Sequence, residues 1–191
     1  MSKKQEIITT SRRVIYSKGY QATSINDILA AANIGKGQFY HYFSSKYDLG
    51  LAVVEDLVKE WDEEVFSGIF QSKLSPVAKL NKMLERTLLF HTQEEGQSGC
   101  PIGNLAIEMS EHDETFRLKI QCIFDRWISS IEETLNELIM QGHFPSPMDS
   151  KKHAQSIIAM IEGGILLMKN QKDASFLTNI LDLIRAQYRL S

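Results

Sequence analysis

Apolar residues recur at helical spacing along most of the chain, and short polar or Pro/Gly interruptions divide the pattern into segments. The 191 residues include only 4 Pro and 11 Gly, and long stretches lack both, which favours an all-α fold. We expect about nine helices, over approximately residues 3–18, 24–32, 36–43, 46–70, 76–91, 101–109, 111–141, 150–170 and 175–189.

Capping signals precede several of these segments. Ser24 followed by Asp27 is the S-x-x-D form of a capping box, and Ser110 followed by Asp113 repeats it. Ser45 stands directly before the long segment that runs to about residue 70. We therefore expect helices to begin at or next to these three serines.

The segment 23–46, TSINDILAAANIGKGQFYHYFSSK, predicts two short helices joined by a tight turn. Apolar residues at i, i+3, i+4 and i+7 give the first helix one buried face. Asn33 follows as the turn residue, because its short amide side chain tolerates the left-handed conformation. Two short helices in this order predict a helix-turn-helix, whose second helix enters the DNA major groove.

The same segment resembles the motif of the TetR family of bacterial transcriptional regulators. The matching positions are Thr23, Ser24, Asp27, Ile28, Ala32, Ile34, Lys36, Gly37, Phe39, Tyr40, Tyr42, Phe43, Lys46 and Leu49. Leu29, Asn33, Tyr42 and Tyr47 differ from the residues most common in the family. Tyr42 is a match because the family has His or Tyr at this position, although His is the more common of the two.

The resemblance implies a division of the chain into two functional domains. Residues 1–48 would form the DNA-binding domain, and residues 49–191 a helical domain for effector binding and dimerisation. The apolar last two helices include IEGGILL at 161–167, which resembles the family's dimer interface. A homodimer would read a palindromic double-stranded operator, with half-sites about 34–36 Å apart. Repression, relieved by a small molecule, is the family's usual output.

Charge supports this division. The whole chain has a net charge of −3, which by itself does not suggest a nucleic-acid partner. Residues 1–48, however, hold seven Lys or Arg against three Asp or Glu, a net charge of +4, so the remainder carries −7. A basic end on an acidic body is typical of a DNA reader attached to a domain that does not bind DNA.

The residues expected to meet DNA gather on the second helix of the motif and at its borders. Lys and Gln side chains can bond to guanine and adenine edges, and Gly37 lets the backbone approach the bases. Hydroxyl groups and Lys46 would contact phosphates, as similar positions do in the family. The candidates are Thr23, Ser24, Lys36, Gly37, Gln38, Tyr40, His41, Tyr42 and Lys46.

An effector site would lie in the helical body, and we expect an apolar or aromatic small molecule there. The alternative for each candidate side chain is ordinary core packing. The candidates are Phe66, Thr87, His91, Cys100, Asn104, Glu108, Phe124, Trp127, Met160 and Met168.

Cys100 raises a second hypothesis. It precedes a helix opened by Pro101, where the helix dipole favours a thiolate, so it could sense electrophiles or oxidants. The segment 99–105 also resembles TetR-family subgroups with G-C-x-x-G-N-L in the sixth helix. The alternative is a small buried residue that lines a pocket.

Other functional classes have weaker support. A helical-bundle enzyme would need a Gly-rich phosphate loop or a metal-ligand motif, and neither is present, so we expect no catalytic residue, metal or cofactor. A helical adaptor that binds only protein does not explain the polar and aromatic residues 36–42. No signal peptide or membrane span is evident, so we expect a cytoplasmic protein.

Overall fold

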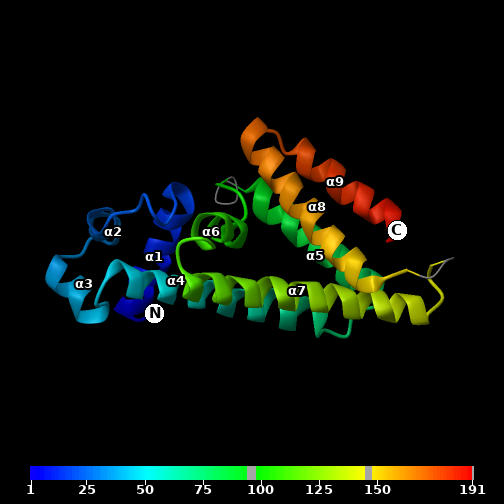
Figure 1. Ribbon diagram of the computed structural model, residues 1–191, viewed down its shortest axis with the longest axis horizontal. Helices are drawn as coiled ribbons and strands as arrows, with labels where there is room; N and C mark the ends of the chain where they lie inside the picture. The colour runs from blue at the N-terminus through cyan, green and yellow to red at the C-terminus, as the bar shows by residue number, and fades with distance from the viewer. Residues whose placement is uncertain (94–97, 145–147, 191) are drawn as a thin grey trace. The chain divides into compact units, whose positions relative to one another are not determined.

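The computed structural model describes residues 1–93, 98–144 and 148–190, and all regular structure in this part is helical (Figure 1). The all-α prediction is therefore confirmed, together with the nine expected helices. The predicted loops at 93–99 and 143–148 lie partly outside the described residues.

The chain forms two compact units, while the division at residue 48, which concerns function, stays a prediction. The first comprises residues 1–60 and 101–121, and the second comprises residues 61–100 and 122–191. Gly50 illustrates why the first unit extends beyond the motif. A Cβ atom at Gly50 would lie 2.5 Å from the Tyr20 ring and 2.9 Å from Phe116, so three distant segments meet closely at this glycine.

The first unit contains the helices of the predicted DNA-binding motif. They are α1 (Lys3–Lys18), α2 (Ile25–Ala32), α3 (Lys36–Tyr42), α4 (Lys46–Trp61), α6 (Pro101–Met109) and the beginning of α7 (Glu114–Met140). Its core is apolar and includes fully buried Ile7, Ile28, Phe39 and Leu49. α1 packs closely on α2.

The second unit contains the remaining elements. They are η1 (Asp62–Phe70), α5 (Pro76–Thr92), the rest of α7, α8 (Ser150–Gln171) and α9 (Ser175–Gln187). α8 and α9 lie side by side (Figure 1). A Cβ atom at Gly164 of α8 would lie 3.3–3.4 Å from Leu177 and Ile180 of α9. The two helices therefore approach each other closely at Gly164.

Two of the three predicted helix starts are as expected. Ser24 and Asp27 form a complete capping box at α2, and the Ser45 hydroxyl accepts the Asp48 N–H at the start of α4. The capping box expected at Ser110 is wrong. Asp113 itself caps α7 by accepting the Phe116 N–H at 2.9 Å, whereas the Ser110 hydroxyl bonds back to the Ala106 carbonyl.

The helix predicted over residues 46–70 changes its hydrogen-bond register part-way. It is an α-helix as far as Trp61 and a π-helix from Asp62 to Phe70. Val65 and Phe66, which are both buried, follow Trp61 by four and five residues. The apolar spacing therefore fits either register and does not predict the change.

Candidate nucleic-acid interface

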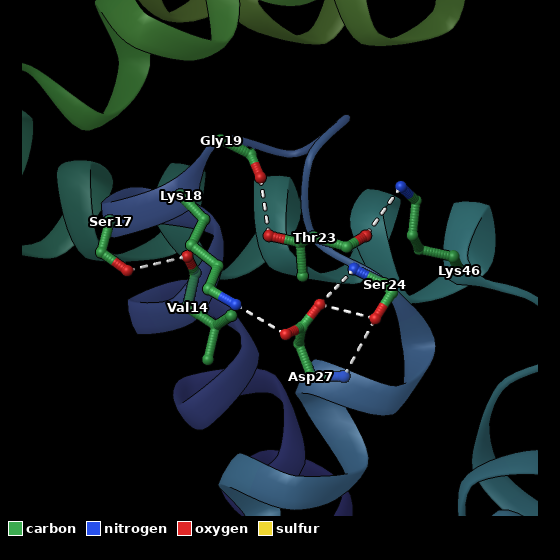
Figure 2. A network of polar contacts seen from close by, with 8 residues as sticks. All are labelled: Val14, Ser17, Lys18, Gly19, Thr23, Ser24, Asp27 and Lys46. Atoms are coloured by element: carbon green, nitrogen blue, oxygen red, sulfur yellow. Dashed lines mark hydrogen bonds and ion pairs between the residues drawn. The ribbon is translucent and has the colours of Figure 1, made fainter.

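The start of α2 is fixed by a compact polar network (Figure 2). The Ser24 side chain accepts the Asp27 N–H, and the Asp27 carboxylate accepts the Ser24 N–H at 2.8 Å. Lys18, at the end of α1, places its ammonium group 2.6 Å from the same carboxylate. These hydrogen bonds, with that from Lys18 the strongest, hold the pKa of Asp27 well below its usual range. The network therefore ties the end of α1 to the start of α2 while Asp27 is ionised.

The turn between α2 and α3 has the conformation that the sequence predicts. Asn33 is left-handed, with φ of 49°, and its N–H points to the carbonyls of Leu29 and Ala30. The Ile34 N–H also bonds to the Leu29 carbonyl, at 3.0 Å. These bonds satisfy carbonyls at the end of α2 and set the direction in which α3 begins.

α3 presents one apolar side to the unit and its polar residues to solvent. Phe39 is fully buried, and Phe43, just after the helix, is 2% exposed. Tyr42 is half-buried beside His41. The predicted contact residues Lys36, Gly37, Gln38, Tyr40 and His41 are exposed.

Gly37 has open space at the position where a side chain would begin. A Cβ atom built on Gly37 would meet nothing within 4 Å, so packing inside the protein does not require glycine at this position. The helix would also be more stable with Ala there. The space above Gly37 is thus available to a molecule that approaches α3 from outside.

Two predicted phosphate contacts have other roles. Thr23 is 1% exposed, and its hydroxyl donates to the Gly19 carbonyl at 2.6 Å. The Lys46 ammonium group donates to the carbonyls of Tyr20, Gln21 and Thr23 at 2.9–3.3 Å. It also lies 4.6 Å from the centre of the Tyr20 ring. The three donors of Lys46 are therefore used to hold the α1–α2 turn, and Figure 2 shows the one that meets the Thr23 carbonyl. We leave both side chains out of the phosphate contacts proposed below.

The same turn is held from another helix by a residue that we had expected at the effector. The two carboxylate oxygens of Glu108, on α6, accept the backbone N–H groups of Tyr20 at 2.8 Å and Gln21 at 2.6 Å. Glu108 is consequently a structural residue of the first unit, and we withdraw it from the effector site. Asn104 also lies on α6, in the first unit.

The other effector candidates belong to the second unit, where three of them form an aromatic cluster. Trp127 and Phe66 are 4% and 2% exposed. Phe124 stacks on Trp127 with 6.5 Å between ring centres, and Trp61 meets Trp127 edge-on at 4.8 Å. The Trp127 N–H points to the sulfur of Met83 at 3.2 Å. These rings fill the interior of the unit and contact one another.

Another pair of candidates lies at a cavity. His91 and Met168 line a space of about 390 Å³ near the ends of α5 and α8, together with Thr92, Lys169, Lys172, Asp173 and Ala174. Thr87 uses its hydroxyl on the Met83 carbonyl, and Met160 is half-buried on α8. Only His91 and Met168 among the predicted residues line this cavity.

Cys100 is 6% exposed and hydrogen-bonds with Glu162 of α8. Burial raises the pKa of Glu162, and the thiol only partly opposes this shift. One carboxyl oxygen of Glu162, Oε1, is buried without a hydrogen-bond partner among the described residues. Sequence reasoning missed Glu162, because a single acidic residue on a helix usually faces solvent. A buried thiol beside a carboxyl group is poorly placed to react with solutes, which disfavours the sensing hypothesis.

Comparison with known proteins agrees with this geometry. Residues 7–53 match the model of the bacterial regulatory proteins of the tetR family, and residues 76–182 match the C-terminal domain of LmrA/YxaF-like transcriptional regulators. The fold and the exposed α3 define a helix-turn-helix transcriptional regulator. The chain belongs to the TetR family.

Relatives extend over nearly the whole chain. An HTH-type transcriptional regulator in the lacX 3′ region of Lactococcus lactis is 39% identical, over 97% of this chain and 92% of its own length. The HTH-type transcriptional repressor DhaR of a Mycobacterium species is 26% identical, over 95% and 89%. A crystal structure of a TetR regulator from Chloroflexus aurantiacus superposes with a TM-score of 0.85 at 26% identity, and covers 96% and 92% of the two chains.

Nowhere in the described ranges do three His, Cys, Asp or Glu side chains gather so that they could hold a metal ion. Within the same ranges, every helix is too short or too polar to span a bilayer.

Proposed function

We propose that this TetR-family regulator is a homodimeric repressor, which acts in the cytoplasm on a palindromic operator and is released by a small apolar or aromatic molecule. The observation that carries the DNA-binding part is the exposure of Lys36, Gly37, Gln38 and Tyr40 along α3. Lys36 and Gln38 supply donors and an acceptor for base edges, and the open space at Gly37 allows close approach. Tyr40, Tyr42 and Ser24 would position the helix on phosphates.

Gly37→Ala separates DNA binding from folding. Ala stabilises a helix over Gly by about 1 kcal/mol, so the variant should melt no lower than the wild type. The added methyl group should nevertheless weaken operator binding about tenfold, a loss of about 1.4 kcal/mol. The measurement is fluorescence anisotropy with duplexes from the DNA upstream of the protein's own gene.

The control is Lys82→Ala, which removes an exposed positive charge on α5. It should leave affinity unchanged, whereas Lys36→Ala should lower it. If the wild type bound none of the duplexes specifically, or if Lys36→Ala and Lys82→Ala behaved alike, α3 would not be the DNA reader.

Exposed apolar side chains on the last two helices support dimerisation. Leu166 and Leu167 of α8 are 59% and 45% exposed, and Phe176 and Leu183 of α9 are 36% and 61% exposed. Burial of such side chains against a second copy is favourable by roughly 25 cal/mol per Å² of apolar surface. Leu183→Glu should give a folded monomer in sedimentation, while Leu89→Glu on α5, equally exposed at 61%, should remain dimeric. A dimeric Leu183→Glu variant would contradict the assignment to these helices.

The effector part rests on the cavity beside His91 and Met168. A ligand that binds only one of two head arrangements shifts their populations by its differential affinity. Screening compounds by the rise in melting temperature identifies the ligand. Met168→Trp should fill the cavity and abolish that rise without loss of DNA binding. A retained rise would place the effector elsewhere.

A further inference from the structure

The π-helical segment η1 is the most unusual backbone feature in the described part of the chain. It extends for nine residues, Asp62–Phe70, directly after α4. At its end the Gln71 N–H bonds to the Phe66 carbonyl, five residues earlier, at 2.8 Å. Most π-helical elements are single-turn bulges, and they occur frequently at functional sites. A segment of this length therefore requires a local cause.

Two residues of α7 contact the beginning of η1 and the residue before it. The Arg126 guanidinium group forms an ion pair with Asp62 and lies 4.2 Å from the centre of the Phe66 ring. One side chain of α7 thus contacts two residues of η1 that are four apart in sequence. Trp127, the next residue of α7, meets Trp61 edge-on at the junction of α4 and η1. These contacts lie within the second unit.

Gly68 adapts the sequence to the π register. A Cβ atom at Gly68 would lie 2.9 Å from the Glu63 carbonyl oxygen, which belongs to the backbone five residues earlier. Real Cβ atoms essentially never come so close to another atom, so the backbone would have to shift. In an α-helix, residue 68 would pair with the carbonyl four residues earlier and would accept Ala without strain. Gly68 thus permits the π register and is unnecessary in the α register.

We propose that η1 is a register switch. It is π-helical while Arg126 contacts Asp62 and Phe66, and it is α-helical when these contacts are lost. In the change from π to α, each backbone N–H moves from the carbonyl five residues earlier to the carbonyl four residues earlier. The segment therefore becomes narrower and longer, and its ends rotate relative to each other. The chain passes from the first unit to the second between Glu60 and Trp61, so this change acts on the covalent connection to the DNA-binding helices. The regulatory half of this inference rests on the proposed function, because it assigns the operator-binding state to the π register.

Gly68→Ala tests the switch, with Ser67→Ala as its matched control. Both positions are exposed neighbours in η1, and both changes improve helix propensity, but only the first places a methyl group against the Glu63 carbonyl. Crystal structures of both variants report the register directly. We expect residues 62–70 of Gly68→Ala to be α-helical and those of Ser67→Ala to remain π-helical.

Operator affinity is the second readout, measured with the duplex that the wild type binds. Gly68→Ala should lower affinity about tenfold, a size typical of allosteric coupling, and Ser67→Ala should not. Arg126→Met releases Asp62 and Phe66 without adding the clash, and should act in the same direction. If Gly68→Ala fails to fold, the operator affinity of Arg126→Met tests the register switch in its place.

The two possible failures are distinguishable. A wild type that binds no operator would overturn the proposed function, while the crystal structures would still report the register. A folded Gly68→Ala variant that keeps the π-helix, or one that becomes α-helical with unchanged operator affinity, would overturn the register switch.

Discussion

The carboxylate of Glu108 accepts the backbone N–H of Tyr20 at 2.8 Å, although the two residues are 88 positions apart in sequence. Its second oxygen accepts the neighbouring N–H of Gln21. A Cβ atom at Gly19 would lie 3.2 Å from the same carboxylate, so the turn after α1 and the side chain of α6 fit closely. α6 therefore helps to fix the geometry at the entrance to α2.

Removing this carboxylate should loosen the turn. Glu108→Ala leaves two backbone donors without their charged acceptor, and hydrogen bonds to charged groups contribute about 1.5–3 kcal/mol. We expect the free energy of unfolding, measured in urea, to fall by about 1–3 kcal/mol. Glu111→Ala, at an exposed position just beyond α6, should change it little. Equal effects of the two variants would indicate that the turn does not depend on Glu108.

Lys46 and Lys36 should affect operator binding in different ways. The Lys46 ammonium group is occupied by three carbonyls, whereas Lys36 is exposed at the start of α3. Lys46→Met should lower stability and weaken binding without changing its salt dependence. Lys36→Ala should lower affinity for the specific operator and leave binding to unrelated duplexes nearly unchanged, as expected for a base contact. An equal loss on all duplexes, with a slope of log K against log salt reduced by about 0.9, would contradict the base contact and indicate a phosphate contact.

The two lysines illustrate what sequence can predict in this fold. Local signals were correct at Ser24 and Asn33, because the capping box and the left-handed turn depend on residues within a few positions. The same signal failed at Ser110, where Asp113 provides the cap instead. The roles of Lys46 and Glu108 depend on partners that are 23–26 and 87–88 positions away. A motif match identified Lys46 as important but could not specify whether it holds DNA or the protein's own turn.

Asn33 offers a test of the turn that leaves α3 unchanged. Gly is common at this position in the family and adopts a φ of 49° without strain, so Asn33→Gly should alter the free energy of unfolding by less than about 1 kcal/mol. Val strongly resists this conformation, and Asn33→Val should lower it by about 1–3 kcal/mol. Thermal melts followed by circular dichroism measure both changes. A stable Val variant would show that the turn can adopt another conformation.

Burial of Glu162 makes stability depend on pH. Its folded-state pKa is raised, so the folded protein retains a proton that the unfolded chain releases above pH 4.5. Stability from this group is therefore complete at lower pH and declines as pH rises through the folded-state pKa. Glu162→Gln should raise the melting temperature more at pH 8 than at pH 5. Glu133→Gln, at an exposed position on α7, is the control and should show no such difference.

The π-helix shows another limit of sequence reasoning. The apolar pattern continues past Trp61 through both Val65 and Phe66, so periodicity does not distinguish the π register from the α register. Arg126 contacts Asp62 and Phe66, which lie more than fifty positions before it in the sequence. Periodicity within η1 does not reveal contacts over such a separation. The aromatic candidates Phe66 and Trp127 were placed together by the fold, but through packing that a pattern of single residues could not specify.

The exposed side chains of α3 have an evolutionary consequence. Lys36 and Gln38 are exposed, and the space at Gly37 serves no internal packing. The helix is held instead by Phe39 and Phe43 on its opposite side. Mutations at the outer positions can therefore accumulate without unfolding the protein. A gene duplicate could acquire a new target sequence while it keeps the same scaffold and the same small-molecule control.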